Sequence, residues 1–335
     1  MRQSLLCTTL ALSASLVTTA LTGRCEAAKM TIENVKYYNN HNCVKLSNGT
    51  VDVIITTDIG PRIIAYRLTG GDNMLREMDP KDGVKTEWGE WHPYGGHRFW
   101  HAPEVLPRSY VPDNDPVKVE ELSDGVKLTP SLEKPTLIQK QILVQLSANS
   151  SEVTITHTLL NRGVWPVEAA CWGLTIMHPG GEEIIPNEAY VSHADKLTAA
   201  RSMVLWNYTD LSDSRFTFGK KYIRVRTDSD KKWANKLGFQ NTLGWTAYAV
   251  NGNLFVKRYP YIAGANYPDQ GCNFETYTDG EFLECETLAP LTMIEPGASA
   301  SHVEKWSLFQ GVKLPATDDA LEATLTPLLK QTKDL

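Results

Sequence analysis

Short runs of alternating apolar and polar residues recur along the chain, separated by Gly, Asn, Asp and Pro. From Val153 to Leu159 the odd positions are valine, isoleucine, histidine and leucine, and the even positions are threonine. This period of two is typical of a strand with one apolar face. A β-branched run at residues 51–55 and a second strand-like run at residues 63–68 flank a turn that contains Gly60 and Pro61, which predicts a hairpin.

Helical periodicity is scarce and is clearest near the C-terminus. Leu321, Leu325, Leu328 and Leu329 fall at helical spacing behind the acidic start at Asp318, although Pro327 interrupts the pattern. We therefore predict an all-β fold, a large antiparallel sandwich, followed by a short C-terminal helix. Because no repeat, low-complexity tract or linker divides the sequence, residues 29–335 are expected to form one domain.

Residues 1–28 have the features of a signal peptide. Arg2 supplies positive charge, residues 5–21 form a mostly apolar core, and residues 25–28 end in small side chains. The core holds several Ser and Thr residues and is shorter than the ~20 apolar residues that a spanning helix needs. Arg24 separates Leu21-Thr22-Gly23 from Cys25, so a signal peptide is favoured over a lipid anchor. We expect an exported protein, periplasmic or secreted, without a stable membrane span.

Charge and cysteine content limit the possible partners. The formal net charge of −6 provides no basic patch, so nucleic acid is not expected as a partner.

Four cysteines follow the leader, at positions 43, 171, 272 and 285, and could form three complete pairings. A hairpin could join Cys272 to Cys285, and free buried cysteines are the alternative. No Cys-x-x-Cys pair is present to suggest a thiolate zinc site or a redox site.

The segment from Trp88 to Glu104 is the richest in potential chemistry. It contains three histidines (His92, His97, His101) and three tryptophans (Trp88, Trp91, Trp100) around Gly95-Gly96. Flat apolar rings beside hydrogen-bonding groups suit a sugar, which has C–H faces to stack and hydroxyls to bind. A buried aromatic loop with satisfied histidines is the alternative interpretation.

Two arginines are candidate ligands for a substrate. Arg98 lies inside the aromatic segment, and Arg62 follows the Gly60-Pro61 turn. A guanidinium offers several fixed donors to hydroxyls, a carboxylate or a phosphate, and each arginine could instead form a structural ion pair.

A metal site is a further alternative for the histidines of this segment. His92, His97 and His101, with Glu90 or Glu104, would provide enough ligands for zinc. Their spacing matches no standard zinc motif, and the Gly-Gly turn leaves their convergence undefined. We therefore predict neither a metal nor another cofactor.

A second polar cluster lies near the C-terminus. Tyr267 and Asp269 begin it and are candidate substrate-binding residues, and Glu284 and Glu286 follow on one face of a predicted strand. Their Cα atoms would lie about 6.6 Å apart, close enough for mutual repulsion to raise one pKa in a dry site. Such a carboxylate could act as a general base or acid, and a solvated outer face of a sandwich is the alternative.

Several motifs, in order, resemble the galactose mutarotase-like (aldose 1-epimerase-like) superfamily, and more closely an uncharacterised branch of it, a domain of unknown function. They are Asp58-Ile59-Gly60-Pro61-Arg62, Gly95-Gly96-His97-Arg98-Phe99-Trp100, Cys285-Glu286-Thr287-Leu288 and the stretch from Glu295-Pro296-Gly297 to Trp306-Ser307-Leu308. The resemblance covers about residues 30–310. It implies a supersandwich of antiparallel sheets with a sugar-binding concave face.

The resemblance also implies a mechanism for the superfamily's aldose 1-epimerases. A glutamate in a Leu-Glu-Thr context takes the anomeric proton, and a histidine protonates the ring oxygen so that the ring opens and recloses. Cys285-Glu286-Thr287 matches the first motif, so Glu286 is the candidate base and Glu284 the second choice. No histidine stands at the family's expected strand position, which leaves His97 or His101 as candidate acids ahead of His178 and His157.

The sequence thus predicts an exported carbohydrate-active protein that binds a sugar or an oligosaccharide. It is either an aldose 1-epimerase-like enzyme with Glu/His acid–base chemistry or a non-catalytic carbohydrate-binding protein on the same fold.

Overall fold

The computed structural model describes residues 30–80, 83–332 and 335. The predicted signal peptide, residues 1–28, lies outside the described residues. Within them, no helix combines the length and apolar character that crossing a bilayer requires.

Two large antiparallel sheets form the body of the described structure, and the first carries the cleft described below. Its strands run in the order β1 (Thr31–Tyr37), β2 (His41–Ser47), β3 (Val51–Thr56), β4 (Ile63–Leu68), β7 (His97–Ala102), β12 (Val167–Met177), β21 (Leu283–Leu288), β20 (Phe274–Thr278), β17 (Asn235–Phe239) and β14 (Met203–Leu205). Strand β22 (Thr292–Ile294) also pairs with β12. Segments from both halves of the sequence thus meet in the middle of one sheet.

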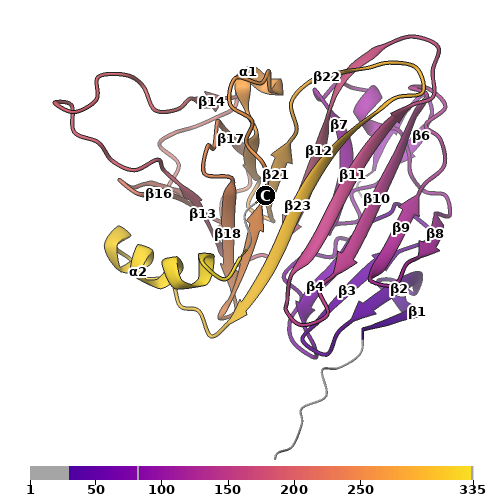
Figure 1. The fold of residues 1–335 in the computed structure, drawn as a ribbon, viewed down its shortest axis with the longest axis horizontal. Coiled ribbons are helices and arrows are strands. Elements are labelled where there is room, and N and C mark those ends of the chain that lie inside the picture. The colour runs from indigo at the N-terminus through magenta and orange to yellow at the C-terminus, as the bar shows by residue number, and fades with distance from the viewer. Residues whose placement is uncertain (1–29, 81–82, 333–334) are drawn as a thin grey trace, which may run out of the picture.

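The second sheet packs behind the first. Its order is β15 (Phe216–Phe218), β16 (Tyr222–Arg226), β13 (Glu182–Pro186), β18 (Trp245–Val250), β19 (Asn253–Arg258), β23 (Ser299–Gln310), β11 (Val153–Asn161), β10 (Ile138–Leu146), β9 (Gly125–Thr129) and β8 (Lys118–Glu121). A separate hairpin joins β5 (Val84–Thr86) to β6 (Gly89–Trp91). Figure 1 shows the N-terminal strands on the right, β13, β16 and β18 on the left, and β23 passing between them.

Side-chain alternation explains why the two sheets bury one shared core. Strands β10 and β11 alternate buried and half-buried residues along their full length, and Val144 pairs with Ile155 in the inward register. Inward residues of both sheets, from Val53 of β3 to Trp306 of β23, form one continuous apolar cluster. The predicted single-faced strand at residues 153–159 is therefore confirmed, and so is the all-β sandwich.

Two helices and one 3-10 turn complete the described structure. Helix α1 (Pro268–Gly271) is a short turn, and a 3-10 turn spans Arg108–Tyr110. Helix α2 (Asp318–Leu329) matches the predicted C-terminal helix, and it includes Pro327. Its Leu321 and Leu325 pack on the outer face of the second sheet, against Trp245. The helix therefore covers apolar surface that would otherwise face water.

The four described cysteines are free and buried, so the expected pairing of Cys272 with Cys285 is wrong. In the β20–β21 ladder Cys285 stands opposite Thr276, whereas Cys272 precedes β20. The Cys272 thiol donates instead to the backbone carbonyl of Asp269 at 3.1 Å.

Candidate functional site

A cleft of about 570 Å³ opens on the face of the first sheet that points away from the core. Strands β7, β12, β21, β20 and β17 form its floor, and loops supply the rim. Its polar groups and aromatic walls come from Trp91, Arg98, Trp100, Glu104, Tyr110, Trp172, Tyr208, Lys236, Tyr277, Glu284 and Glu286. These segments are far apart in sequence, so the cleft exists only in the folded sheet.

Glu286 lies at the centre of the cleft floor and is fully buried. Its Oε2 accepts hydrogen bonds from Trp172 Nε1 at 3.0 Å and from Lys236 Nζ at 3.1 Å. Its Oε1 has no hydrogen-bond partner among the described residues. One carboxylate oxygen is thus fixed by the protein, and the other has unfilled hydrogen-bonding capacity.

Burial shifts the pKa values of the carboxyl groups on the cleft floor. Loss of hydration raises the pKa of Glu286 to about 7, although the Lys236 ammonium opposes the shift. The pKa of Glu275, which stands opposite Glu286 on the neighbouring strand β20, is raised well above its usual range by the same loss of hydration. Lys236 Nζ is 2.7 Å from Glu275 Oε2, and the two carboxylates keep the pKa of Lys236 well above its usual range despite burial. Glu286 can therefore exchange a proton near neutral pH.

A second ion pair lies beside the first. Arg98 Nη1 donates to Glu284 Oε1 at 2.7 Å, and both side chains are almost completely buried. The Arg98 guanidinium also stacks over Trp100, 4.5 Å from the ring centroid, and over Trp91 at 5.6 Å. Because planar rings hold the guanidinium in place, its donors are oriented before any ligand arrives.

Aromatic rings form the walls of the cleft. Trp100 is central, with ring-centroid distances of 5.3 Å to Trp91, 5.5 Å to Trp172 and 4.9 Å to Tyr110. Edge-to-face packing of this kind makes the wall rigid. The cleft thus combines ring faces with charged hydrogen-bonding groups, and Trp91, Arg98, Trp100 and Glu104 are the residues of the aromatic segment that line it.

The histidines of that segment lie elsewhere. Alternate residues of β7 face opposite sides of the sheet, so Arg98 and Trp100 line the cleft while His97 and His101 point between the sheets. His101 Nε2 contacts Glu133 Oε2 at 3.2 Å, on the side away from the cleft. This corrects the expectation that His97 or His101 lines the candidate site, because the strand itself separates both imidazoles from the cleft.

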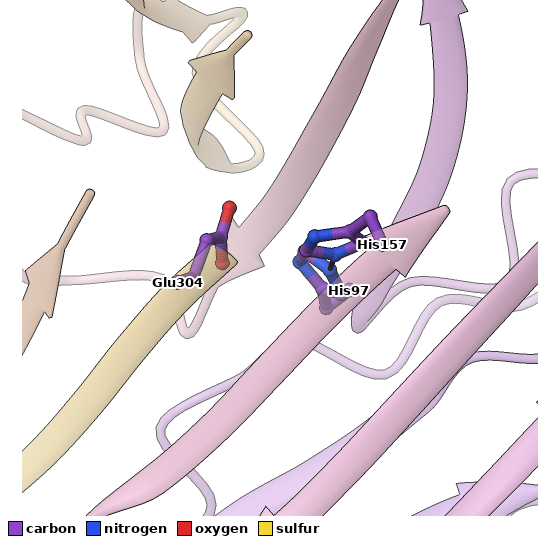
Figure 2. Close-up of side chains that lie close together, drawn as sticks. All are labelled: His97, His157 and Glu304. Carbon is purple, nitrogen blue, oxygen red and sulfur yellow. Dashed lines mark hydrogen bonds between the residues drawn. The ribbon is translucent and has the colours of Figure 1, made fainter. Parts of the chain in front are cut away.

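Figure 2 shows the buried group to which His97 belongs, with His157 and Glu304. His157 Nδ1 lies 3.2 Å from the His302 carbonyl, which can only accept, so this nitrogen donates. Burial lowers the pKa of both His97 and His157, which are therefore neutral. His157 Nε2 then accepts a hydrogen bond from His97 Nε2, 2.7 Å away.

The remaining contacts of this buried group already contain a cation. Lys257 Nζ is 3.3 Å from Glu304 Oε1 and donates to the Thr175 hydroxyl at 2.5 Å. Thr175 in turn contacts His97 Nδ1 at 2.8 Å, and Trp306 Nε1 donates to Glu304 Oε2 at 2.7 Å. Three possible metal ligands lie within 4.8 Å of one another here, yet their hydrogen bonds are completed by protein groups and the ammonium balances the carboxylate. We therefore interpret this group as an inter-sheet polar network.

The metal alternative that used His92, His97 and His101 fails on geometry. His92 packs near Tyr94, with ring centroids 5.7 Å apart, whereas His97 contacts Thr175 and His101 contacts Glu133. The three imidazoles do not converge. His178 does not line the cleft either, and its Nδ1 lies 2.8 Å from the Pro179 carbonyl.

Three further candidates lie outside the cleft. Arg62 is fully buried and forms a two-bond ion pair with Asp113, at 2.5 and 3.0 Å, so its guanidinium is committed to structure. The Tyr267 hydroxyl accepts from the backbone N–H of Ile262 at 2.9 Å. Asp269 lies in α1, and neither it nor Tyr267 lines the cleft. These placements correct the expectation that Arg62, Tyr267 and Asp269 contact substrate.

Sequence reasoning missed Trp172, Tyr208, Lys236 and Glu275. Lys236 and Glu275 sit in short strand-like runs that carry no distinctive motif. Only the strand order β21-β20-β17 brings them beside Glu286. Trp172 is the one with a local signal, because it stands in the strand where the family histidine is expected.

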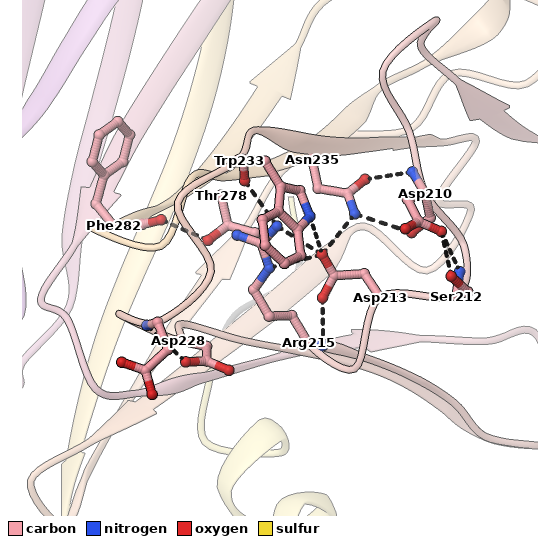
Figure 3. Close-up of polar contacts among 10 residues, drawn as sticks. Asp210, Ser212, Asp213, Arg215, Asp228, Trp233, Asn235, Thr278 and Phe282 are labelled. Carbon is pink, nitrogen blue, oxygen red and sulfur yellow. Dashed lines mark hydrogen bonds and ion pairs between the residues drawn. The ribbon is translucent and has the colours of Figure 1, made fainter.

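A polar network supports the segment that leads into β17. As Figure 3 shows, Asp213 is the hub: its Oδ2 accepts from Arg215 Nη2 at 2.8 Å, from Trp233 Nε1 at 2.9 Å and from Asn235 Nδ2 at 3.2 Å. The Asp213–Arg215 pair is fully buried. Asn235 directly precedes Lys236, so this network fixes the start of the strand that carries the cleft ammonium.

Comparisons with known proteins agree with the fold. No family model and no curated protein matches the chain. A galactose mutarotase-like protein from Clostridium acetobutylicum is 11% identical, with a TM-score of 0.52 over 84% of this chain and 99% of that one. A galactose mutarotase related enzyme from Lactobacillus acidophilus is 9% identical, with a TM-score of 0.50 over 82% and 98%. A TPR-domain containing protein from Parabacteroides distasonis is 13% identical, with a TM-score of 0.52 over 83% of this chain and 50% of its own.

The chain therefore has the galactose mutarotase-like, aldose 1-epimerase-like fold that its motifs predicted. At these identities the likeness concerns the fold, and function must be argued from the cleft itself.

Proposed function

We propose that the cleft binds a sugar. The observation that carries this proposal is the convergence of two ion pairs, Arg98–Glu284 and Lys236–Glu286, on the floor of one aromatic-walled cleft. Sugar hydroxyls both donate and accept, and paired charges offer both functions at fixed positions. The Trp100 and Trp172 walls suit the C–H faces of the ring.

The same cleft supports acid–base ring opening as the enzymatic form of the proposal. Glu286 Oε1 would take the anomeric hydroxyl proton while the bond from C1 to the ring oxygen breaks, and the ring oxygen would gain a proton from an acid. Hydroxyl donors among the cleft-lining residues include those of Tyr208 and Tyr277. Burial raises the pKa of Tyr208 to about 12, so this hydroxyl keeps its proton at neutral pH.

A binding protein without turnover is the second candidate, and one observation favours it. Among residues 30–80, 83–332 and 335, no histidine lines the cleft, whereas the family mechanism uses one as the acid. The two candidates share the sugar and differ in whether a proton donor reaches the ring oxygen.

Calorimetry and polarimetry together test both forms. Purified protein is titrated with aldoses and short oligosaccharides, and the decay of optical rotation is followed for freshly dissolved aldoses. Saturable binding with an accelerated decay supports the enzyme, and binding with the buffer rate supports the binding protein. Failure of every sugar to bind overturns the proposal. Glu286→Gln keeps the shape of the site and should reduce any catalysed rate by about 10²–10⁴-fold, because it removes the base.

The proposal includes export, which rests on the leader-like residues 1–28. Mass spectrometry of the protein recovered from its native cells should find the mature N-terminus near Ala28 or Lys29. An intact Met1 or Arg2 terminus would contradict it.

A further inference from the structure

Lys236 occupies an unusual position for a lysine. It is 5% exposed and lies between Glu275 and Glu286, which are both fully buried and stand directly opposite each other in the β20–β21 ladder. Its Nζ is 2.7 Å from Glu275 Oε2 and 3.1 Å from Glu286 Oε2. The rings of Trp172 and Trp206 lie 5.1 and 4.8 Å from the ammonium and complete its surroundings. We call Glu275, Lys236 and Glu286 the charge triad.

The charges of the triad do not balance when all three groups are ionised. Two almost completely buried carboxylates would share one ammonium, and one negative charge would be left without a partner. Arg98, whose charge also acts on Glu286, is already paired with Glu284 at 2.7 Å. An uncompensated buried carboxylate is costly, and it normally takes up a proton instead.

Hydrogen bonding decides which carboxylate holds that proton. Glu286 receives a hydrogen bond from Trp172 Nε1 in addition to that from Lys236, and both favour its ionised form. Lys236 Nζ, 2.7 Å from Oε2, is the one polar group among the described residues that contacts the Glu275 carboxylate, so Glu275 lacks the second donor that Trp172 provides to Glu286, and it does not line the cleft. The burial-driven rise in the pKa of Glu275 agrees with this assignment.

We propose that Glu275 holds the shared proton of the triad and that Lys236 is a positioning residue which favours the ionised form of Glu286 toward the cleft. This inference deepens the proposed function and rests on it, because it describes how Glu286 is prepared to accept a hydrogen bond or proton from a sugar. Lys236 thus provides Glu286 with a fixed cationic partner from the same sheet, and this role requires no histidine.

Other titratable groups face the triad and must be held constant in any test. They are Arg98 on β7, Glu284 on β21, Tyr277 on β20, Tyr208 on the rim, and Cys272 and Asp269 beside Glu275. None of them is altered by the substitutions below.

Infrared difference spectroscopy tests the proton on Glu275 without any sugar. A protonated carboxyl has a carbonyl stretch that ionised carboxylates lack, so at pH 7 the spectrum of the unmodified protein minus that of Glu275→Gln should contain this band. Its absence would overturn the assignment. Glu183 is also buried, with its pKa raised to about 7 by burial, and it cancels in the difference because both proteins contain it.

Carbon-13 NMR of labelled glutamate side chains tests the role of Lys236. Lys236→Met should raise the midpoint of Glu286 by about one to three pH units, since it removes a cation in direct contact. Lys236→Arg should keep the midpoint of Glu286 close to that of the unmodified protein, because it retains a cation at this position. Glu275→Gln should leave the midpoint nearly unchanged, because a neutral amide replaces a neutral acid. A downward shift of about one unit or more in Glu275→Gln, or no shift in Lys236→Met, would overturn the proposal.

Sugar binding then separates this inference from the proposed function. If sugars bind, the pH midpoint of affinity should follow the Glu286 midpoint in each variant. If no sugar binds while the spectroscopic shifts occur as expected, the proposed function fails and the triad stands. Circular dichroism of each variant confirms that it is folded, and Lys236→Arg and Glu275→Gln preserve the size of the side chain if Lys236→Met does not fold.

Discussion

Strands β7 and β21 present different chemistry on their two faces. On the outer face Arg98, Glu284 and Glu286 are charged and line an open cleft, with unfilled hydrogen-bonding capacity at Glu286 Oε1. On the inner face His97 and Thr287 join a closed network between the sheets. Burial alone does not distinguish the two faces, since both are nearly inaccessible. Unfilled hydrogen-bonding capacity beside a cavity distinguishes the outer face, and it supports the proposal that this face binds a ligand.

The largest expected difference between the faces concerns their lysines. Lys257→Met should cost about 3–5 kcal/mol of unfolding free energy, because it leaves Glu304 buried with its charge uncompensated. Lys236→Met should cost less, since Glu275 and Glu286 have raised pKa values and can become neutral. Urea unfolding at pH 7 measures both. Equal losses of unfolding free energy would show that the outer carboxylates retain their charge without Lys236, as Glu304 does without Lys257.

Acid should affect the two faces in opposite directions. Burial lowers the pKa of His302 to about 3 from an ordinary 6.5, so the unfolded chain binds more protons between these values and stability falls as pH falls through that window. Burial raises the pKa of Glu286 to about 7 from 4.5, so its contribution falls as pH rises through that window. Each group contributes at most about 1.4 kcal/mol per pH unit.

The Glu286→Gln variant separates these two contributions. Between pH 4.5 and 6.5 they oppose each other, so removing the outer carboxyl should make stability rise more steeply with pH than in the unmodified protein. Thermal unfolding at several pH values in this range gives the slope. An unchanged or shallower slope of stability against pH in Glu286→Gln would contradict the opposite contributions expected from the two faces.

The division between the faces also explains what could be predicted from sequence. Strand alternation and turn residues were enough to predict the fold. The period of two also predicts that Glu284 and Glu286 share one face of their strand. The same alternation places His97 opposite Arg98, and this could have been deduced once residues 97–102 were assigned to a strand. Lys236 and Glu275 could not be found in this way, because their approach to Glu286 depends on the strand order β21-β20-β17. The same limit applies to Arg62, whose partner Asp113 lies 51 residues away.

The smallest expected effect comes from two tryptophans of one sequence segment. Trp100 is 4% exposed and forms the cleft wall beside Arg98, whereas Trp88 is 37% exposed and lies by a different cavity. Trp100→Ala should weaken sugar affinity by about two- to tenfold, or ~0.5–1.5 kcal/mol, through lost stacking. Trp100→Phe should lose less, and Trp88→Ala should retain full affinity. Calorimetry at a temperature at which circular dichroism shows each variant to be folded makes the comparison. If Trp88→Ala lost as much affinity as Trp100→Ala, the sugar would have to contact both cavities, and the cleft on the outer face would be only part of the site.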